Sequence, residues 1–122
     1  MEAEKFSIRK RVKSFYYAGE GLVHFFRREH NAWIHLCATV VVIVLALVVK
    51  VSYLEAIALA FAVGLVWVAE ILNTCIERMA DLITQERHPG IKAVKDMAAG
   101  AVLVAAIVAV IIGLFIFIPK IL

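Results

Sequence analysis

The stretch Glu70-Ile-Leu-Asn-Thr-Cys-Ile-Glu77 places two carboxylates and an amide at one end of an otherwise apolar segment. At about 100° per residue, the polar residues of this region share a helical stripe about 80° wide, formed by Glu70, Asn73, Glu77 and Asp81. An acidic residue near the centre of a bilayer costs roughly 2.5–3.5 kcal/mol, and such residues usually face a bundle interior or a functional cavity. The stretch therefore predicts a membrane-spanning helix that carries a polar site.

The composition predicts a small integral membrane protein. Of the 122 residues, 64% are hydrophobic and the mean hydropathy is +0.94, whereas soluble domains usually contain about 45–50% apolar residues. The first 13 residues are mostly polar and basic, so we expect no signal peptide that is removed. The net charge is +3, but the basic residues flank apolar segments, which favours a membrane surface as their partner and excludes nucleic acid.

The hydrophobic pattern predicts an all-α chain with one surface helix and three spans, folded as a single domain over residues 1–122. The N-terminal segment carries apolar and basic side chains at helical spacing, as do amphipathic helices that lie on a membrane. The three apolar segments are long enough for a hydrocarbon core roughly 30 Å thick. The predicted elements are a surface helix over about 6–28 and spans over about 33–49, 53–76 and 98–118.

The end of the second span differs from the others because its helical pattern does not stop with the apolar residues. We expect this helix to continue beyond the membrane to about Thr84. Pro89 and Gly90 then mark a loop before the third span.

The distribution of basic residues predicts the orientation. Seven Lys and Arg residues precede the first span and four lie between residues 77 and 97, against one in the 50–53 loop and one near the C-terminus. Because cytoplasmic loops carry the excess of Lys and Arg, we expect the N-terminus in the cytoplasm and the C-terminus outside. Three spans are few to enclose a polar site, so several copies of the chain are expected to share it.

On this topology, acidic residues gather at the inner membrane boundary. Glu70 lies about 26 Å along its helix from Tyr53, close to the inner edge of the hydrocarbon core, where it can meet a lipid headgroup. Glu77 lies two turns further on, and Glu29 ends the surface helix. Their carboxylates are the oxygen ligands that Mg²⁺ prefers, and Mg²⁺ usually bridges to phosphates.

Cations that could hold phosphate oxygens are expected on the same side of the membrane. Lys95 follows the polar loop, and either Lys10 or Arg11 extends from the surface helix. A base on an acceptor hydroxyl, a metal on the polyphosphate and cations on the developing charge are the parts that phosphoryl transfer requires. The sequence contains neither Gly-x-x-x-x-Gly-Lys-Ser/Thr nor Gly-x-Gly-x-x-Gly, so this would be a kinase without the common nucleotide motifs.

The order and spacing of these residues resemble those of the small bacterial integral-membrane lipid kinases, the diacylglycerol kinase and undecaprenol kinase family. The resemblance rests on the Glu70–Glu77 stretch, Asp81, His88-Pro89 and Lys95-Asp96-Met-Ala-Ala-Gly100-Ala-Val-Leu103. It extends over nearly the whole chain, including Tyr17, Gly21-Leu22 and Glu29-His-Asn31. The segment from Glu29 to His35 is more similar to the undecaprenol kinase branch.

The resemblance implies a homotrimer of three-span subunits in the bacterial inner membrane, which uses MgATP to phosphorylate a membrane lipid alcohol. Undecaprenol is the first expected acceptor and diacylglycerol the second. By the same resemblance, Glu70 is the catalytic base, and Asn73 and Ala99 lie with it beside the acceptor. Glu29 and Glu77 are the implied metal ligands. The implied nucleotide contacts are Lys10, Tyr17, Glu29, Glu77, Glu86, Arg87, His88, Lys95 and Asp96.

Two positions depart from the enteric diacylglycerol kinase pattern. His35 stands where those enzymes tend to have Glu, and Ala99 stands where they tend to have Ser. His35 has no second histidine at metal-ligand spacing and is expected to be a polar group at the membrane interface. These differences leave the predicted chemistry intact and bear on which acceptor is used.

Other interpretations of the same residues stay open at this point. Glu70 and Asn73 could hold transmembrane helices together by hydrogen bonds. Asp81 could be a solvated residue at a helix end. A small proton-coupled transporter would use Glu70 to exchange protons for a cationic substrate, and a structural accessory subunit would have no turnover at all.

Overall fold

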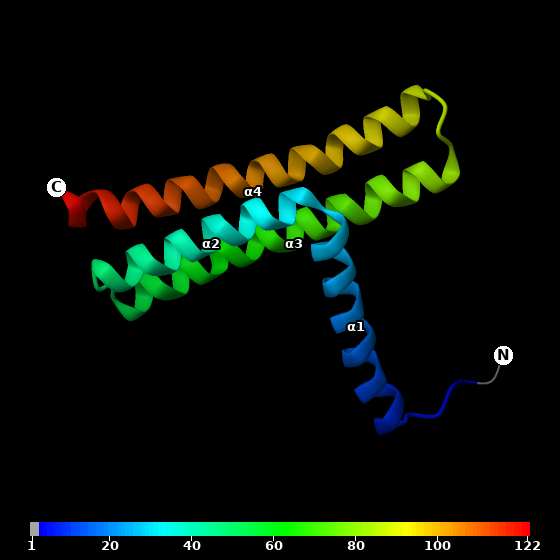
Figure 1. The fold of residues 1–122 in the computed structure, drawn as a ribbon, viewed down its shortest axis with the longest axis horizontal. Helices are drawn as coiled ribbons and strands as arrows, with labels where there is room; N and C mark the ends of the chain where they lie inside the picture. The colour runs from blue at the N-terminus through cyan, green and yellow to red at the C-terminus, as the bar shows by residue number, and fades with distance from the viewer. Residues whose placement is uncertain (1–2) are drawn as a thin grey trace. The chain divides into compact units, whose positions relative to one another are not determined.

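The computed structural model describes residues 3–122. These residues form four α-helices, α1 (Ile8–Arg28), α2 (His30–Val48), α3 (Tyr53–Ile83) and α4 (Pro89–Ile121) (Figure 1). The chain divides into two compact units, one ending at Ile34 and the other covering His35–Leu122. α2 therefore begins in the first unit and continues in the second. The all-α fold class agrees with the sequence prediction.

Three of the helices, α2, α3 and α4, are long and apolar enough to cross a membrane, in agreement with the predicted number of spans. α3 continues past residue 76 to Ile83, as predicted from its helical pattern. α4 begins at Pro89, so the prediction that Pro89 and Gly90 belong to a loop is wrong: Pro89 occupies the first turn of a helix, where its missing N–H is not needed. Hydropathy identifies the part of a helix that lies in lipid, whereas the backbone hydrogen bonds continue until a cap ends them. The polar ends of α3 and α4 therefore remain helical beyond the apolar segments.

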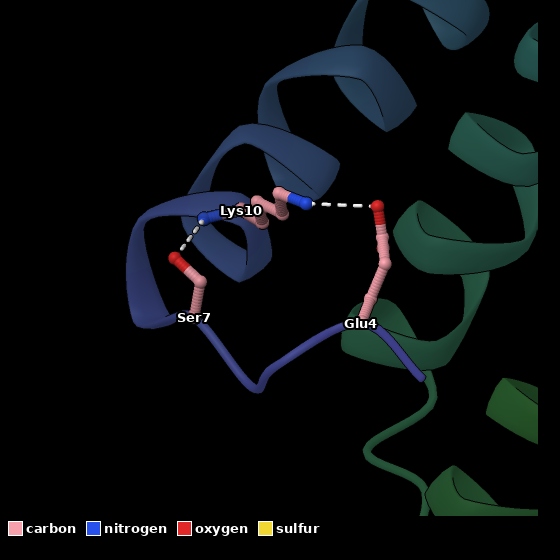
Figure 2. Close-up of polar contacts among 3 residues, drawn as sticks. All are labelled: Glu4, Ser7 and Lys10. Atoms are coloured by element: carbon pink, nitrogen blue, oxygen red, sulfur yellow. Dashed lines mark hydrogen bonds and ion pairs between the residues drawn. The ribbon is translucent and has the colours of Figure 1, made fainter. Parts of the chain in front are cut away.

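In the first unit, α1 is capped at both ends. The backbone of Ser7 is extended, and its Oγ accepts a hydrogen bond from the Lys10 N–H at 3.4 Å (Figure 2). At the other end, the Glu29 N–H donates to the Phe25 carbonyl at 3.0 Å, and the indole Nε1 of Trp33 donates to the Phe26 carbonyl at 3.0 Å. These bonds satisfy carbonyls that the last turn of a helix leaves unpaired. They complete the last turn of α1 within the first unit.

In the second unit, α3 and α4 lie side by side (Figure 1). Small side chains are buried on both helices, Ala62 and Ala80 on α3 and Ala98 and Ala105 on α4, and small residues let transmembrane backbones approach closely. Ion pairs join the two helices near each end. Lys120 Nζ lies 3.0 Å from Glu55 Oε1, and Lys95 Nζ lies 2.6 Å from Asp81 Oδ1.

The turn between α2 and α3 is short because each helix is stopped or started by one residue. Lys50 has a φ of 55°, a left-handed conformation that is uncommon outside glycine and ends α2. Ser52 and Glu55 form a capping box at the start of α3: the Ser52 N–H donates to Glu55 Oε1 at 2.9 Å, and the Glu55 N–H donates to Ser52 Oγ at 3.2 Å. The turn makes α2 and α3 an antiparallel pair.

Candidate active site

Glu70 is a buried carboxylate in the middle of the candidate site. It lies on α3, and only 5% of the residue is exposed. Its Oε2 lies 3.3 Å from Nε2 of His35 on α2. Within residues 3–122, the structure shows no other ion pair of Glu70. Burying a carboxylate is strongly unfavourable unless it is paired or hydrogen-bonded, so the histidine is a required partner within this chain.

The imidazole of His35 is itself held by residues of both helices. Its ring packs edge-on against Trp67 of α3, with centroids 6.1 Å apart. The indole Nε1 of Trp67 donates to Thr39 Oγ1 at 2.9 Å, and the Thr39 hydroxyl donates to the His35 carbonyl at 2.7 Å. His35, Thr39, Trp67 and Glu70 thus form one polar cluster between α2 and α3, which we call the Glu70 cluster.

An apolar groove of about 880 Å³ runs between α2 and α3 from the turn at Lys50 to Thr39 and Trp67. Thr39 and Trp67 therefore belong both to the groove lining and to the Glu70 cluster. The groove ends at these two residues, next to the cluster that holds the buried carboxylate.

The polar stripe continues along α3 beyond Glu70. Asn73 is partly buried, and its Oδ1 has no hydrogen-bond partner within the described part of the chain. Glu77 lies one turn further on and is also partly buried. Residues four apart lie on one face of a helix, so these two groups offer oxygen donors side by side. Ala99, the other residue predicted beside the acceptor, is exposed on α4.

Five residues predicted to contact the nucleotide line one pocket of about 690 Å³ at the loop between α3 and α4: Glu86, Arg87, His88, Lys95 and Asp96. The loop is positioned by His88, which caps α4. Its Nδ1 accepts from the Gly90 N–H at 3.0 Å and from the Ile91 N–H at 3.4 Å. Pro89 suits the first turn of α4, where its missing N–H would have no partner in any case.

Both lysines of this pocket are paired with carboxylates. Lys95 contacts Asp81 as described above, which gives Asp81 a definite partner that the sequence did not indicate. Lys92 lies 2.6 Å from Asp96 one turn away, and this hydrogen bond, with the nearby negative charge, raises the pKa of Lys92. All four side chains are at least one-third exposed, so these pairs are weak and exchangeable.

The remaining predicted residues belong to the first unit. Lys10 Nζ lies 3.0 Å from Glu4 Oε1, and both side chains are exposed (Figure 2). Arg11, the alternative phosphate contact, lies over the Phe6 ring at 5.6 Å. Tyr17 is exposed and packs edge-on against its neighbour Tyr16. Glu29 is the C-cap residue of α1 and is partly buried.

The donors fit a hard divalent cation by their chemistry. Within residues 3–122, no group of three or more His, Cys, Asp or Glu side chains is close enough to hold a metal ion alone. Mg²⁺, however, is usually bound by one or two carboxylates plus substrate phosphates and water. Glu77 and the unpaired Oδ1 of Asn73 are oxygen donors of the required kind on α3.

These features define a class of protein, a small helical membrane protein with a buried carboxylate on one spanning helix and a charged pocket at the loop that follows this helix. The sequence matches the model of the family described as prokaryotic diacylglycerol kinase over residues 16–117. It is 44% identical to an undecaprenol kinase of Bacillus subtilis over 108 residues, covering 88% of each chain.

Diacylglycerol kinases are also similar to this chain. One from Synechocystis sp. is 40% identical over 110 residues, which cover 89% of this chain and 63% of that protein. One from Escherichia coli is 40% identical over 74 residues, which cover 61% of each chain.

The chain belongs to the prokaryotic diacylglycerol kinase family. It is a lipid kinase and a membrane protein, as the sequence predicts. Membership implies ATP as the phosphate donor and a lipid as the acceptor.

His35 was expected only as a polar group at the membrane interface, and its contact with Glu70 was not predicted. A signal was available, because His35 precedes the 50–53 loop by about as many residues as separate that loop from Glu70. An antiparallel hairpin brings residues equidistant from its turn to the same depth. That symmetry places an imidazole and a carboxylate at one level of the membrane.

Proposed function

We propose that the protein transfers the γ-phosphoryl group of ATP, with Mg²⁺, to the hydroxyl of a membrane lipid alcohol, with undecaprenol as the first acceptor and diacylglycerol as the second. The observation that carries this proposal is Glu70, a 5%-exposed carboxylate on a membrane-spanning helix. Similarity to the Bacillus undecaprenol kinase over most of both chains supports the choice of acceptor. Membership of a lipid kinase family favours this activity over the proton-coupled transporter.

In the proposed reaction, Glu70 accepts the proton of the lipid hydroxyl while the hydroxyl oxygen attacks the γ-phosphorus. A phosphorus–oxygen bond forms to the lipid, the bond to the β-phosphate oxygen breaks, and ADP leaves. The products are the lipid monophosphate, ADP and the proton on Glu70, which is later released. The apolar groove between α2 and α3 supports a route by which an alcohol embedded in the bilayer reaches this carboxylate.

In this proposal, ATP binds in the pocket at the loop between α3 and α4. Glu86, Arg87, His88, Lys95 and Asp96 line it, and a pocket of about 690 Å³ has room for a nucleotide. Lys10 and Tyr17 of α1 complete the proposed contacts. Lys95 exchanges Asp81 for phosphate oxygens when ATP binds, because an exposed ion pair is held weakly.

Glu29 and Glu77 are the proposed metal ligands, and Asn73 and Ala99 the residues beside the acceptor. When bound, Mg²⁺ would neutralise charge on the polyphosphate and orient its γ-phosphoryl group. The unpaired Oδ1 of Asn73 supports a further polar ligand at this turn of α3. Glu77 also belongs to the nucleotide contacts through the metal.

We further propose a homotrimer in the bacterial inner membrane, with the whole chain as one kinase domain, α1 as the amphipathic surface helix and the N-terminus in the cytoplasm. Many large apolar side chains of the spanning helices are exposed in a single chain, including Phe61, Leu65 and Phe115. Lipid or neighbouring subunits are expected to cover them.

The test is a competition assay. Purified protein in lipid nanodiscs receives labelled ATP and Mg²⁺ with undecaprenol and diacylglycerol together, and the labelled lipids are separated. We expect label mainly in undecaprenyl phosphate. Label mainly in phosphatidic acid would reverse the order of acceptors, and ATP consumption without any labelled lipid would refute the proposed reaction.

A further inference from the structure

We propose that His35 is a positioning residue for phosphoryl transfer, whose imidazole holds one oxygen of the Glu70 carboxylate and leaves the other for the lipid hydroxyl. This inference rests on the proposed role of Glu70 as the base. His35 lies on α2, whereas Glu70 lies on α3. The histidine would act on the reaction through Glu70, without touching the acceptor itself.

The imidazole lies close to one oxygen of the carboxylate. His35 Nε2 is 3.3 Å from Glu70 Oε2, and an imidazole that carries a proton on Nε2 has a donor facing that oxygen. This contact is longer than a typical N–H···O hydrogen bond, and catalytic contacts commonly shorten only when substrate is bound. A carboxylate rotates broadly about its last torsion when nothing holds it. The histidine fixes this rotation and directs Oε1 away from itself.

The imidazole of His35 is held in place by residues of both helices. The Trp67 ring packs against its edge, and the Thr39 hydroxyl that accepts from Trp67 donates to the His35 carbonyl. α2 and α3 each contribute two members of the cluster, so a shift of one helix would move the imidazole relative to the carboxylate. Positioned groups of this kind matter because a displacement of about 1 Å in a reacting group can lower a rate roughly 100-fold.

The contact between His35 and Glu70 is largely shielded from solvent. Only 5% of Glu70 is exposed, and the His35 side chain is 24% exposed. In such surroundings a hydrogen bond is stronger than in water, and removing one partner leaves the other polar group without compensation. The exposed pairs of the α3–α4 loop, in contrast, can be replaced by water. We therefore expect that removing His35 disturbs the position of Glu70 more than removing one member of an exposed ion pair disturbs the other member.

The experiment compares His35→Leu with His35→Gln. Leucine removes the donor, whereas the glutamine amide nitrogen reaches about as far as Nε2 and can donate to the same oxygen. We expect His35→Leu to lower kcat for lipid phosphorylation about 10- to 100-fold with little change in the KM for ATP. His35→Gln should recover most of that loss. His30→Leu is the matched control, because His30 is an exposed histidine of the same helix.

Thermal unfolding of the three variants in the same nanodiscs separates positioning from helix packing. Positioning predicts that kcat recovers in His35→Gln whether or not the melting temperature does. If kcat in His35→Leu equals that of the wild type, or falls only in proportion to the folded fraction, the inference is wrong. A wild type that phosphorylates no lipid would instead refute the proposed function, so the two failures are distinguishable.

Discussion

The two ends of the polar stripe on α3 differ in how their charges are held. At Glu70, a buried carboxylate has one partner, His35, within a cluster enclosed by α2 and α3. At the loop between α3 and α4, Lys95 and Lys92 are paired with Asp81 and Asp96 in the open. A buried group must keep its partner, whereas an exposed one can exchange it for a ligand. The first arrangement suits a base of fixed direction, and the second suits a site that binds and releases a nucleotide.

The largest effect is expected at the buried end. Glu70→Gln keeps the size and shape of the side chain but cannot accept the hydroxyl proton, so kcat should fall by about 10²- to 10⁴-fold. Steady-state transfer of labelled phosphate to lipid measures this change. The variant should elute from a sizing column as the wild type does. A fully active Glu70→Gln protein would show that Glu70 is not the base.

Glu77 lies between the two ends of the stripe, and its replacement should have the second-largest effect on the rate. Replacing a carboxylate ligand by an amide weakens the binding of the metal ion. We therefore expect Glu77→Gln to lower the rate about 100-fold at limiting Mg²⁺. Higher Mg²⁺ should restore part of the activity. The measurement is a titration of the rate with Mg²⁺, with Glu70→Gln as the comparison because its loss should not respond. An unchanged Mg²⁺ dependence would exclude Glu77 as a ligand.

At the exposed end, Lys95→Met should raise the KM for ATP about 10-fold or more, because it removes a charge-assisted hydrogen bond to phosphate. Asp81→Asn is the control. It breaks the same ion pair but leaves the cation, so its KM should stay within about 3-fold of the wild-type value. If Asp81→Asn raised the KM as much as Lys95→Met, the ion pair itself and not the free lysine would support nucleotide binding.

The smallest effect concerns the pair between Lys92 and Asp96. Because Asp96 raises the pKa of Lys92 above that of an ordinary lysine, the stability that this pair contributes is present below that ordinary value, about 10.4. It is lost as the pH rises through the raised pKa. Lys92→Met should therefore melt about 1–2 °C below the wild type near neutral pH. The gap should close at high pH, and a gap that widened there would contradict this assignment.

Much of this arrangement could be predicted from the sequence because it is local. The spans follow from hydropathy, and the alignment of Glu70, Asn73 and Glu77 follows from helical periodicity. The grouping of Glu86 to His88 with Lys95 and Asp96 also depends on residues close in sequence. The pairing of Lys95 with Asp81 depends on how α4 packs against α3, and no local pattern contains that packing.

The contact between His35 and Glu70 lies between these cases. It joins two helices, so periodicity within either helix cannot predict it. It could be anticipated only by measuring both residues from the turn that connects the helices. The extension of α3 could be predicted, because its helical pattern continues to about Thr84, where the structure has the C-cap. The start of α4 at Pro89 could not, because Pro89 and Gly90 also suit a loop and hydropathy does not show a helix that begins outside the lipid.

The central claim is that the buried end performs the transfer and the exposed end binds the nucleotide. It is tested most directly by measuring phosphate transfer to undecaprenol over a wide range of ATP concentrations in the wild type, Glu70→Gln and Lys95→Met. We predict that Lys95→Met approaches the wild-type rate as ATP approaches saturation, whereas Glu70→Gln stays about 10²- to 10⁴-fold slower than the wild type at every concentration. Recovery of Glu70→Gln at high ATP would contradict the account.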